Sequence, residues 1–256
     1  MELTAEEVGF EGDGGAALRA TFTGPAGDDE LPALLLLHEV FGADVHMHEV
    51  ARRLAGEGFR VLLPDLYSRD GLPGPASSEA DPAPRWEREA IRAAVASLPD
   101  RRTLRDLEAA LAWLGARDDV LDEEPGVVGF CMGGTLAFLL GCTSTSVGAV
   151  VDFYGRPLYP ELSPEKPTQP LELTLNLDRP FLGFFGEADE GIPTEHVELL
   201  RQKLASGAKN FELVTYPGCA HGFFNDRRSN HDPAAAEDAW RRTIAFLHEV
   251  LTPDFP

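Results

Sequence analysis

Residues 126–140 read GVVGFCMGGTLAFLL, and this stretch decides the fold. It has the pattern of a short apolar strand, a glycine-rich turn and the first turns of a helix, with Cys131 in the turn. A sharp strand-to-helix turn strains its central residue and leaves room only for small neighbours, which Gly129 and Gly133 provide. The N–H groups that begin the helix favour a thiolate and can stabilise an oxyanion. The stretch therefore predicts a nucleophile elbow with Cys131 as the nucleophile.

The alternative is that Cys131 is a small buried hydrophobic residue in an ordinary glycine-rich turn. A cysteine nucleophile needs a base, and the base needs a group that fixes its tautomer. Both are found downstream, because the strand-like run 180–185 is followed by Asp189 and the run 211–216 by His221. This order of nucleophile, acid and base is that of α/β-hydrolases, and it predicts a catalytic triad.

Other candidates for the acid and the base fit this pattern less well. Glu187 shares its loop with Asp189 and stays open as the alternative orienting carboxylate. His196 and His248 fall within predicted helices, and His231 immediately precedes a helix start. None of these histidines follows a strand-like run in the required order.

The sequence resembles the dienelactone hydrolase (carboxymethylenebutenolidase-like) family in five motifs. In chain order they are HEVFG at 38–42, PDLY at 64–67, GFCMGG at 129–134, GEAD at 186–189 and AHGF at 220–223. The resemblance runs from about residue 34 to the C-terminal helix. It implies an α/β-hydrolase fold with about eight mainly parallel strands, and hydrolysis of an ester or lactone through a thioacyl-enzyme without a cofactor.

The resemblance also implies roles for residues outside the triad. Glu39 would be the partner of the Cys131 thiol in the resting enzyme, and the backbone N–H groups of Val40 and Met132 would form the oxyanion hole. A carboxylate close to a thiol disfavours the thiolate, which gives the pairing a physical reason. Without the resemblance, Glu39 would be interpreted as a polar residue that ends a strand, and we interpret His38 as a structural or supporting residue.

One departure from the family pattern concerns the substrate. Four residues after the base, where the best-studied members carry an arginine that binds the substrate carboxylate, this chain has Asn225. An asparagine donates hydrogen bonds but has no charge, so it binds a carboxylate less strongly than a guanidinium does. We therefore predict that Asn225 contacts the substrate and gives little preference for an anion. The other family arginine would be Arg85, Arg88 or Arg92, a choice that the sequence leaves open.

Length and composition fit a single α/β domain covering residues 1–256. The formal net charge is −21, which argues against a nucleic-acid or anionic-membrane partner. The chain has no long apolar stretch and no signal-peptide pattern, and its 3 cysteines are too few for a disulfide framework. We expect a cytoplasmic monomer or small homo-oligomer that acts on a small molecule.

A metal site is not expected. Neighbouring histidines such as His46 and His48, two apart on a predicted helix, point in different directions and cannot easily share one ion with His38. Two other functions stay open beside lactone hydrolysis: a general carboxylesterase or thioesterase, and a redox-sensing or binding protein that lost turnover.

Periodicity also predicts the elements. We expect an N-terminal hairpin of two edge strands, then six core strands, six helices, a loop at 70–83 and a proline-rich rim or lid at 157–178. The expected strands are 8–11, 17–23, 34–37, 61–63, 127–129, 149–153, 181–185 and 213–214. The expected helices are 45–57, 84–98, 101–114, 134–140, 193–204 and 234–251.

Overall fold

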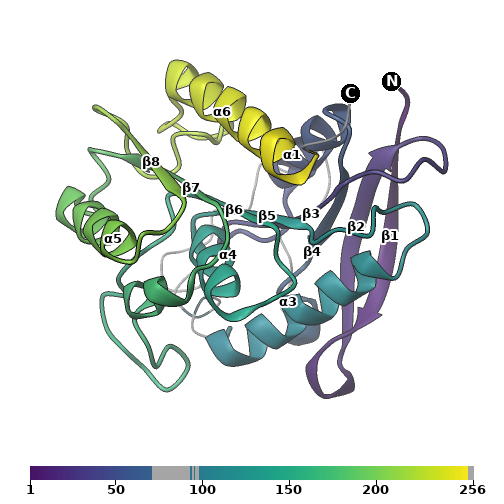
Figure 1. Ribbon diagram of the computed structural model, residues 1–256, viewed down its shortest axis with the longest axis horizontal. Coiled ribbons are helices and arrows are strands. Elements are labelled where there is room, and N and C mark those ends of the chain that lie inside the picture. Colours follow the sequence, from purple (N-terminus) through teal and green to yellow (C-terminus); the bar gives the residue numbers. More distant parts are fainter. Residues whose placement is uncertain (71–92, 94, 96–97, 253–256) are drawn as a thin grey trace.

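The computed structural model describes residues 1–70, 93, 95 and 98–252. One sheet of eight strands, in the order β1-β2-β4-β3-β5-β6-β7-β8, organises these residues (Figure 1). The strands are β1 (Leu3–Glu11), β2 (Ala17–Pro25), β3 (Ala33–Leu37), β4 (Arg60–Pro64), β5 (Gly126–Phe130), β6 (Ala149–Phe153), β7 (Phe181–Gly186) and β8 (Phe211–Tyr216). The sheet is antiparallel where β2 pairs with β1 and β4, and parallel from β4 to β8.

Helices cover both faces of the sheet. In Figure 1, α1 and α6 lie on one side of the strands and α3 and α4 on the other, with α5 beside the β7 and β8 end. The bounds are α1 (Val45–Gly56), α3 (Asp100–Gly115), α4 (Met132–Thr143), α5 (Thr194–Ser206) and α6 (Pro233–Leu251). Short 3-10 helices are η1 (Asp13–Gly15), η2 (Ser68–Asp70) and η3 (Pro170–Asn176).

Burial on both faces explains the composition of the central strands. Every residue of β3, β4, β5, β6 and β7 is buried, and apart from Arg60 in β4 and Asp152 in β6 these strands are therefore apolar instead of alternating. Parallel strands bring their carboxyl ends to one edge of the sheet, so the loops after β3, β5, β7 and β8 meet there. This edge is where the sequence places its candidate residues.

The predicted α/β-hydrolase architecture is confirmed, with two differences. The expected hairpin forms, but of its two strands only β1 lies at the edge of the sheet, because β2 also pairs with β4. The rim or lid at 157–178 is anchored, because η3 packs on α4 and α5, and Asp100 at the start of α3 accepts from Tyr159 and Lys166 at 2.9 and 2.8 Å. Most of the helix expected at 84–98 and the loop at 71–83 lie outside the described residues.

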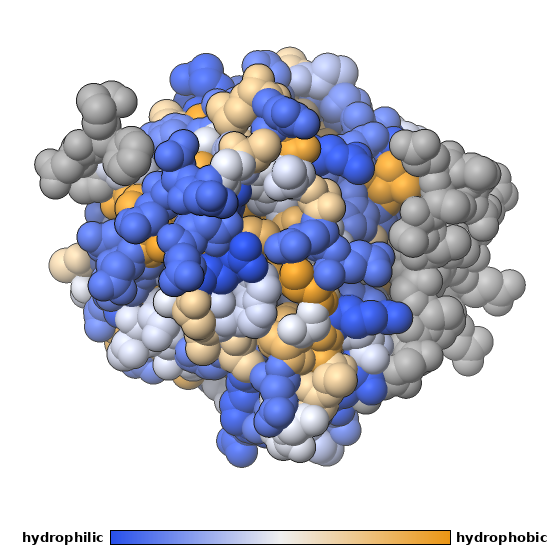
Figure 2. All heavy atoms as spheres, turned by 90° about the vertical axis from the view of Figure 1, so that its right-hand side faces the viewer, coloured by the Kyte–Doolittle hydropathy of each residue, from blue (hydrophilic) through white to orange (hydrophobic). Residues whose placement is uncertain are grey.

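The β1 edge is protected by polar side chains. Its residues Thr4, Glu6 and Glu7 are exposed, and charged residues at an edge strand discourage pairing with another chain. Figure 2 shows this side of the molecule as mostly hydrophilic, with small apolar patches between polar ones. Among the described helices, none is both long and apolar enough to cross a membrane.

Candidate active site

The turn between β5 and α4 has the geometry that the sequence predicts. Cys131 has φ 55° and ψ −114°, a strained backbone conformation that residues other than glycine rarely adopt. A Cβ atom on Gly129 would lie 2.0 Å from the carbonyl oxygen of Gly133, and one on Gly133 would lie 2.3 Å from that of Leu37. Both glycines are therefore sterically required. The turn leaves Cys131 partly exposed at the N-terminus of α4.

The Cys131 thiol, His221 and Asp189 form one hydrogen-bonded line. The Sγ atom of Cys131 lies 3.0 Å from Nε2 of His221, and Nδ1 of His221 lies 2.6 Å from Oδ2 of Asp189. An ionised carboxylate only accepts, so Nδ1 carries the proton and Nε2 is left to accept from the thiol. This arrangement can move a proton from sulfur to the ring.

The loop after β7 fixes the carboxylate of Asp189. Its other oxygen, Oδ1, accepts from the backbone N–H groups of Gly191 and Ile192 at 2.8 and 3.1 Å, and the residue is 4% exposed. Glu187, the alternative in this loop, is exposed. The geometry therefore favours Asp189 over Glu187 as the orienting acid.

Charges in this line shift the pKa values in opposite directions. For Asp189, burial alone would raise the pKa, but the bond and charge of His221 and the two backbone N–H groups hold it below its usual value. For His221, burial favours the neutral ring, but Cys131 and Asp189 outweigh it and raise the pKa well above the ordinary value. A ring that holds a proton strongly is suited to accept one from a thiol.

Glu39 lies at the end of β3 in a second polar cluster. It is 3% exposed, and its Oε2 atom accepts a hydrogen bond of 2.8 Å from Nδ2 of Asn225, which is 1% exposed. Nε of Arg228 is 3.9 Å from the same oxygen, and its guanidinium lies over the ring of Phe41 at 3.6 Å. The hydrogen bond of the thiol goes to His221 instead of Glu39 in this structure. Asn225 contacts Glu39, and its direct contact with a substrate stays a prediction.

Tyr154, after β6, is a residue that the sequence reasoning missed. It has φ 47°, is fully buried, and its ring centroid is 5.1 Å from that of His221. Burial and the charges of Glu39 and Cys131 raise the pKa of its hydroxyl well above the ordinary value, so it stays protonated. Its place at the carboxyl end of a core strand was the available signal.

Buried Asp152 and the loop after β6 stabilise the turn that carries Cys131. Its Oδ1 atom accepts from the N–H of Gly155 at 2.7 Å, and burial raises the pKa of this carboxyl to about 7. The N–H of Cys131 donates to the carbonyl of Phe153 at 2.9 Å, and Arg156 N–H donates to the Thr135 hydroxyl at 2.7 Å. The strained elbow is thus held by bonds from the neighbouring strand.

A clamp of two side chains surrounds the residues after β3. Nδ1 of His38 is 2.6 Å from the carbonyl oxygen of Glu39, and the Tyr67 hydroxyl donates to the carbonyl of Val40 at 2.9 Å. The same hydroxyl is 3.8 Å from Sδ of Met132. The backbone of Val40, the first predicted oxyanion donor, is therefore fixed from two sides.

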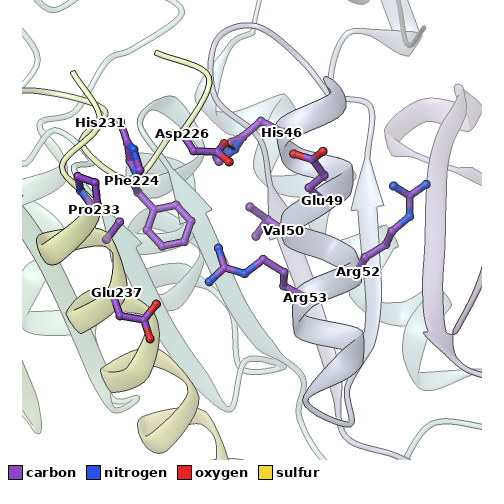
Figure 3. Close-up of a pocket in the computed structure, with 11 residues that line it drawn as sticks. His46, Glu49, Val50, Arg52, Arg53, Phe224, Asp226, His231, Pro233 and Glu237 are labelled. Carbon is purple, nitrogen blue, oxygen red and sulfur yellow. Dashed lines mark hydrogen bonds and ion pairs between the residues drawn. The ribbon is translucent and has the colours of Figure 1, made fainter. Parts of the chain in front are cut away.

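A groove of about 600 Å³ lies between α1 and α6 (Figure 3). Three of its residues, His46, Glu49 and Asp226, present possible metal ligands within 4.8 Å of one another. Arg227 already binds both carboxylate oxygens of Glu49, at 2.6 and 3.2 Å, and a guanidinium there opposes a cation. The Nδ1 atom of His46 lies 3.2 Å from Asp226. These contacts instead hold the loop that carries His221 against α1.

The other sequence candidates lie elsewhere. His248 stacks on Phe59 with ring centroids 4.8 Å apart, and His196 is in α5. All three cysteines are free thiols, with Cys142 and Cys219 buried. Arg85, Arg88 and Arg92 are outside the described residues.

Comparisons with known proteins agree with this fold. A sequence profile described as the dienelactone hydrolase family matches residues 18–251. An Escherichia coli (strain K12) protein, named provisionally as a carboxymethylenebutenolidase, is 32% identical over 222 residues, 87% of this chain and 78% of the relative. A Bradyrhizobium protein is 30% identical over 236 residues, 92% of this chain and 91% of the relative, and is named as a probable 2-oxo-3-(5-oxofuran-2-ylidene)propanoate lactonase.

A solved structure shows the same architecture. The crystal structure of a Klebsiella pneumoniae protein, identified provisionally as a dienelactone hydrolase, superposes with a TM-score of 0.87 at 29% identity. The superposition covers 97% of this chain and 100% of the Klebsiella pneumoniae chain. The similarity therefore extends over the whole sheet and its flanking helices.

Proposed function

The chain belongs to the dienelactone hydrolase family and hydrolyses ester or lactone bonds, and from this premise we propose that Cys131 is its nucleophile. The observation that carries the proposal is the hydrogen-bonded line from the thiol through His221 to Asp189, with distances of 3.0 and 2.6 Å. Such a line is the requirement for an activated thiol. We take residues 1–256 as the functional domain.

In the first half-reaction, the thiol proton passes to Nε2 of His221 while the sulfur of Cys131 attacks the carbonyl carbon. The carbonyl oxygen becomes an oxyanion that the N–H groups of Val40 and Met132 stabilise. The carbon–oxygen bond to the alcohol then breaks, and the leaving oxygen takes the proton from His221. The product is a thioester on Cys131.

In the second half-reaction, His221 accepts a proton from water, and the resulting hydroxide attacks the thioester carbonyl. The carbon–sulfur bond breaks, the acid leaves, and the proton returns to the thiol of Cys131. Asp189 holds the tautomer of His221 throughout, and it stabilises the charged ring in each half. With a lactone the leaving alcohol remains part of the acid product.

Glu39 has a separate role in this proposal. Its carboxylate lies in a buried cluster with Asn225 and beside the cationic Arg228. We propose that this carboxylate is the partner of the Cys131 thiol before substrate binds, as the family resemblance implies, and that Arg228 balances its charge. Small esters and lactones are the proposed substrates. The alternative functions differ in the bond that is cleaved: a general carboxylesterase would prefer open-chain esters, and a thioesterase would cleave thioesters.

The test is steady-state hydrolysis of a chromogenic ester and a small lactone panel by Cys131→Ala and His221→Ala. Loss of the nucleophile or base lowers kcat by about 10⁴ or more, while circular dichroism shows a retained fold. Cys142→Ala is the matched control, because Cys142 is a free buried thiol in α4, away from the turn. Turnover by Cys131→Ala at the wild-type rate would contradict the proposal, as would a wild type that stops after one equivalent.

A further inference from the structure

The peptide that joins Glu39 to Val40 carries one of the two proposed oxyanion donors. In a trans peptide the C=O and N–H bonds point in opposite directions across a rigid plane. The described chain has no cis peptide bond. Any group that fixes the carbonyl oxygen of Glu39 therefore also fixes the direction of the Val40 N–H.

His38 is such a group. Its Nδ1 atom lies 2.6 Å from the carbonyl oxygen of Glu39, and its Nε2 atom lies 3.1 Å from the backbone nitrogen of Leu66. A backbone N–H only donates, so Nε2 accepts and Nδ1 carries the proton that the Glu39 carbonyl accepts. The N–H of Gly42 donates to this carbonyl as well, at 3.1 Å.

The surroundings of His38 keep this arrangement neutral and rigid. The side chain is 0% exposed, and burial lowers its pKa below the ordinary value, although the bond to Glu39 opposes the shift. Its ring lies 5.3 Å from that of Tyr67, whose hydroxyl fixes the following peptide through the carbonyl of Val40. The ring thus acts as a fixed donor at neutral pH.

We propose that His38 is a positioning residue for the oxyanion hole, because its Nδ1–H holds the Glu39 carbonyl and so aims the Val40 N–H at the reacting carbonyl. The bond also polarises the peptide and makes its N–H a better donor. The inference rests on the proposed function, because it needs an oxyanion to form beside Cys131. It assigns a role in transition-state stabilisation to a residue that touches neither substrate nor nucleophile.

Two substitutions separate positioning from simple packing. In His38→Asn, the amide nitrogen has the same place in the side chain as Nδ1 and can donate to the Glu39 carbonyl. In His38→Leu, this donor is lost. Both variants remove the acceptor of the Leu66 N–H. Because both variants lose this acceptor, a difference between them reports the donor to the Glu39 carbonyl alone. If His38→Leu fails to fold, His38→Met takes its place.

The experiment measures kcat and KM for a chromogenic ester, and in parallel the rate at which iodoacetamide alkylates Cys131. Alkylation displaces iodide from a tetrahedral carbon and forms no oxyanion, so it reports the thiol without the oxyanion hole. Removal of one oxyanion-hole donor lowers kcat by about 100- to 1000-fold. In His38→Leu the Val40 N–H is present but wrongly oriented, so we expect kcat to fall by about 10- to 100-fold. His38→Asn stays within about fivefold of wild type, and KM and alkylation change little in both.

Three results would overturn the inference: equal loss of kcat in the leucine and asparagine variants, alkylation that falls in parallel with kcat, or wild-type kcat in His38→Leu. Cys131→Ala distinguishes this failure from that of the proposed function. If Cys131→Ala is inactive while His38→Leu is fully active, only the role of His38 is wrong. If Cys131→Ala still turns over, the proposed nucleophile itself is wrong.

Discussion

Asp189→Asn should convert His221, the proposed base, into the wrong tautomer. Oδ1 of Asp189 accepts from two backbone N–H groups, so the asparagine oxygen should keep that place. Its amide nitrogen then replaces the atom that lies 2.6 Å from Nδ1 of His221 and donates to it. The ring proton is displaced to Nε2, which faces Cys131 and can no longer accept from the thiol.

The size of this effect follows from the nucleophile. The tautomer change costs about 10⁴ in kcat for a serine enzyme, but a thiol is more acidic and more nucleophilic than a hydroxyl, so we expect about 10²–10³ here. The loss is smaller than for Cys131→Ala or His221→Ala, because Asp189 orients and does not react. The assay is kcat/KM for a chromogenic ester, with Glu187→Gln as the control from the same loop. A loss below about threefold, or equal damage from Glu187→Gln, would refute the reasoning.

The same variant predicts a change with pH. In the wild type, burial lowers the pKa of His221, but Cys131 and Asp189 outweigh it and raise this pKa above its ordinary 6.5. The stability that these interactions contribute is therefore full between the ordinary pKa of Asp189, 3.8, and that of His221, 6.5; it is lost as pH rises through the folded pKa of His221 and as pH falls through the lowered pKa of Asp189. Asp189→Asn removes one cause and lowers the pKa of His221, so its melting temperature should fall most between about pH 4 and pH 6.5. A pH-independent difference would contradict this assignment.

Three further predictions concern the turn and the second cluster. Gly129→Ala places a methyl group against the Gly133 carbonyl, so the free energy of unfolding, measured by thermal unfolding, should fall by about 3 kcal/mol or more. An unchanged melting temperature would contradict the elbow geometry. Glu39→Gln removes a negative charge, so iodoacetamide should alkylate Cys131 faster near neutral pH, and slower alkylation with unchanged activity would exclude the proposed role. The Arg228 side chain lies beside Glu39 and is 33% exposed, so we predict that its guanidinium binds a substrate carboxylate; Arg228→Gln should lower kcat/KM for a carboxylate-bearing lactone about 5- to 10-fold more than for a neutral ester of equal size, whereas equal losses would exclude this role.

The fold and the proximity of Cys131, His221 and Asp189 could be predicted because local rules and sheet topology determine them. The steric need for Gly129 and Gly133 is a property of one turn. The order of Cys131, Asp189 and His221 follows from parallel strands, which bring their carboxyl ends to one edge. Each of these residues lies in the turn or loop that follows a strand, so the sheet topology brings the three segments to the same edge.

The second cluster could not be predicted because it depends on side-chain packing between distant segments. The contact of Asn225 with a substrate stays a prediction, but the bond from its amide to Glu39, 186 positions away in sequence, had no signal in the sequence. The sequence around Tyr154 predicts neither its positive φ nor its contact with the ring of His221. The role of His38 depends on which nitrogen meets the Glu39 carbonyl, which the tertiary structure determines.

The central claim is that the acyl group passes through Cys131. The most direct measurement is mass spectrometry of the wild type quenched within the first turnovers of an activated ester. The account predicts an adduct of the acyl mass on the peptide that contains Cys131, lost on further incubation and absent from Cys131→Ala. Steady turnover without any adduct on this cysteine, together with activity in Cys131→Ala, would contradict it.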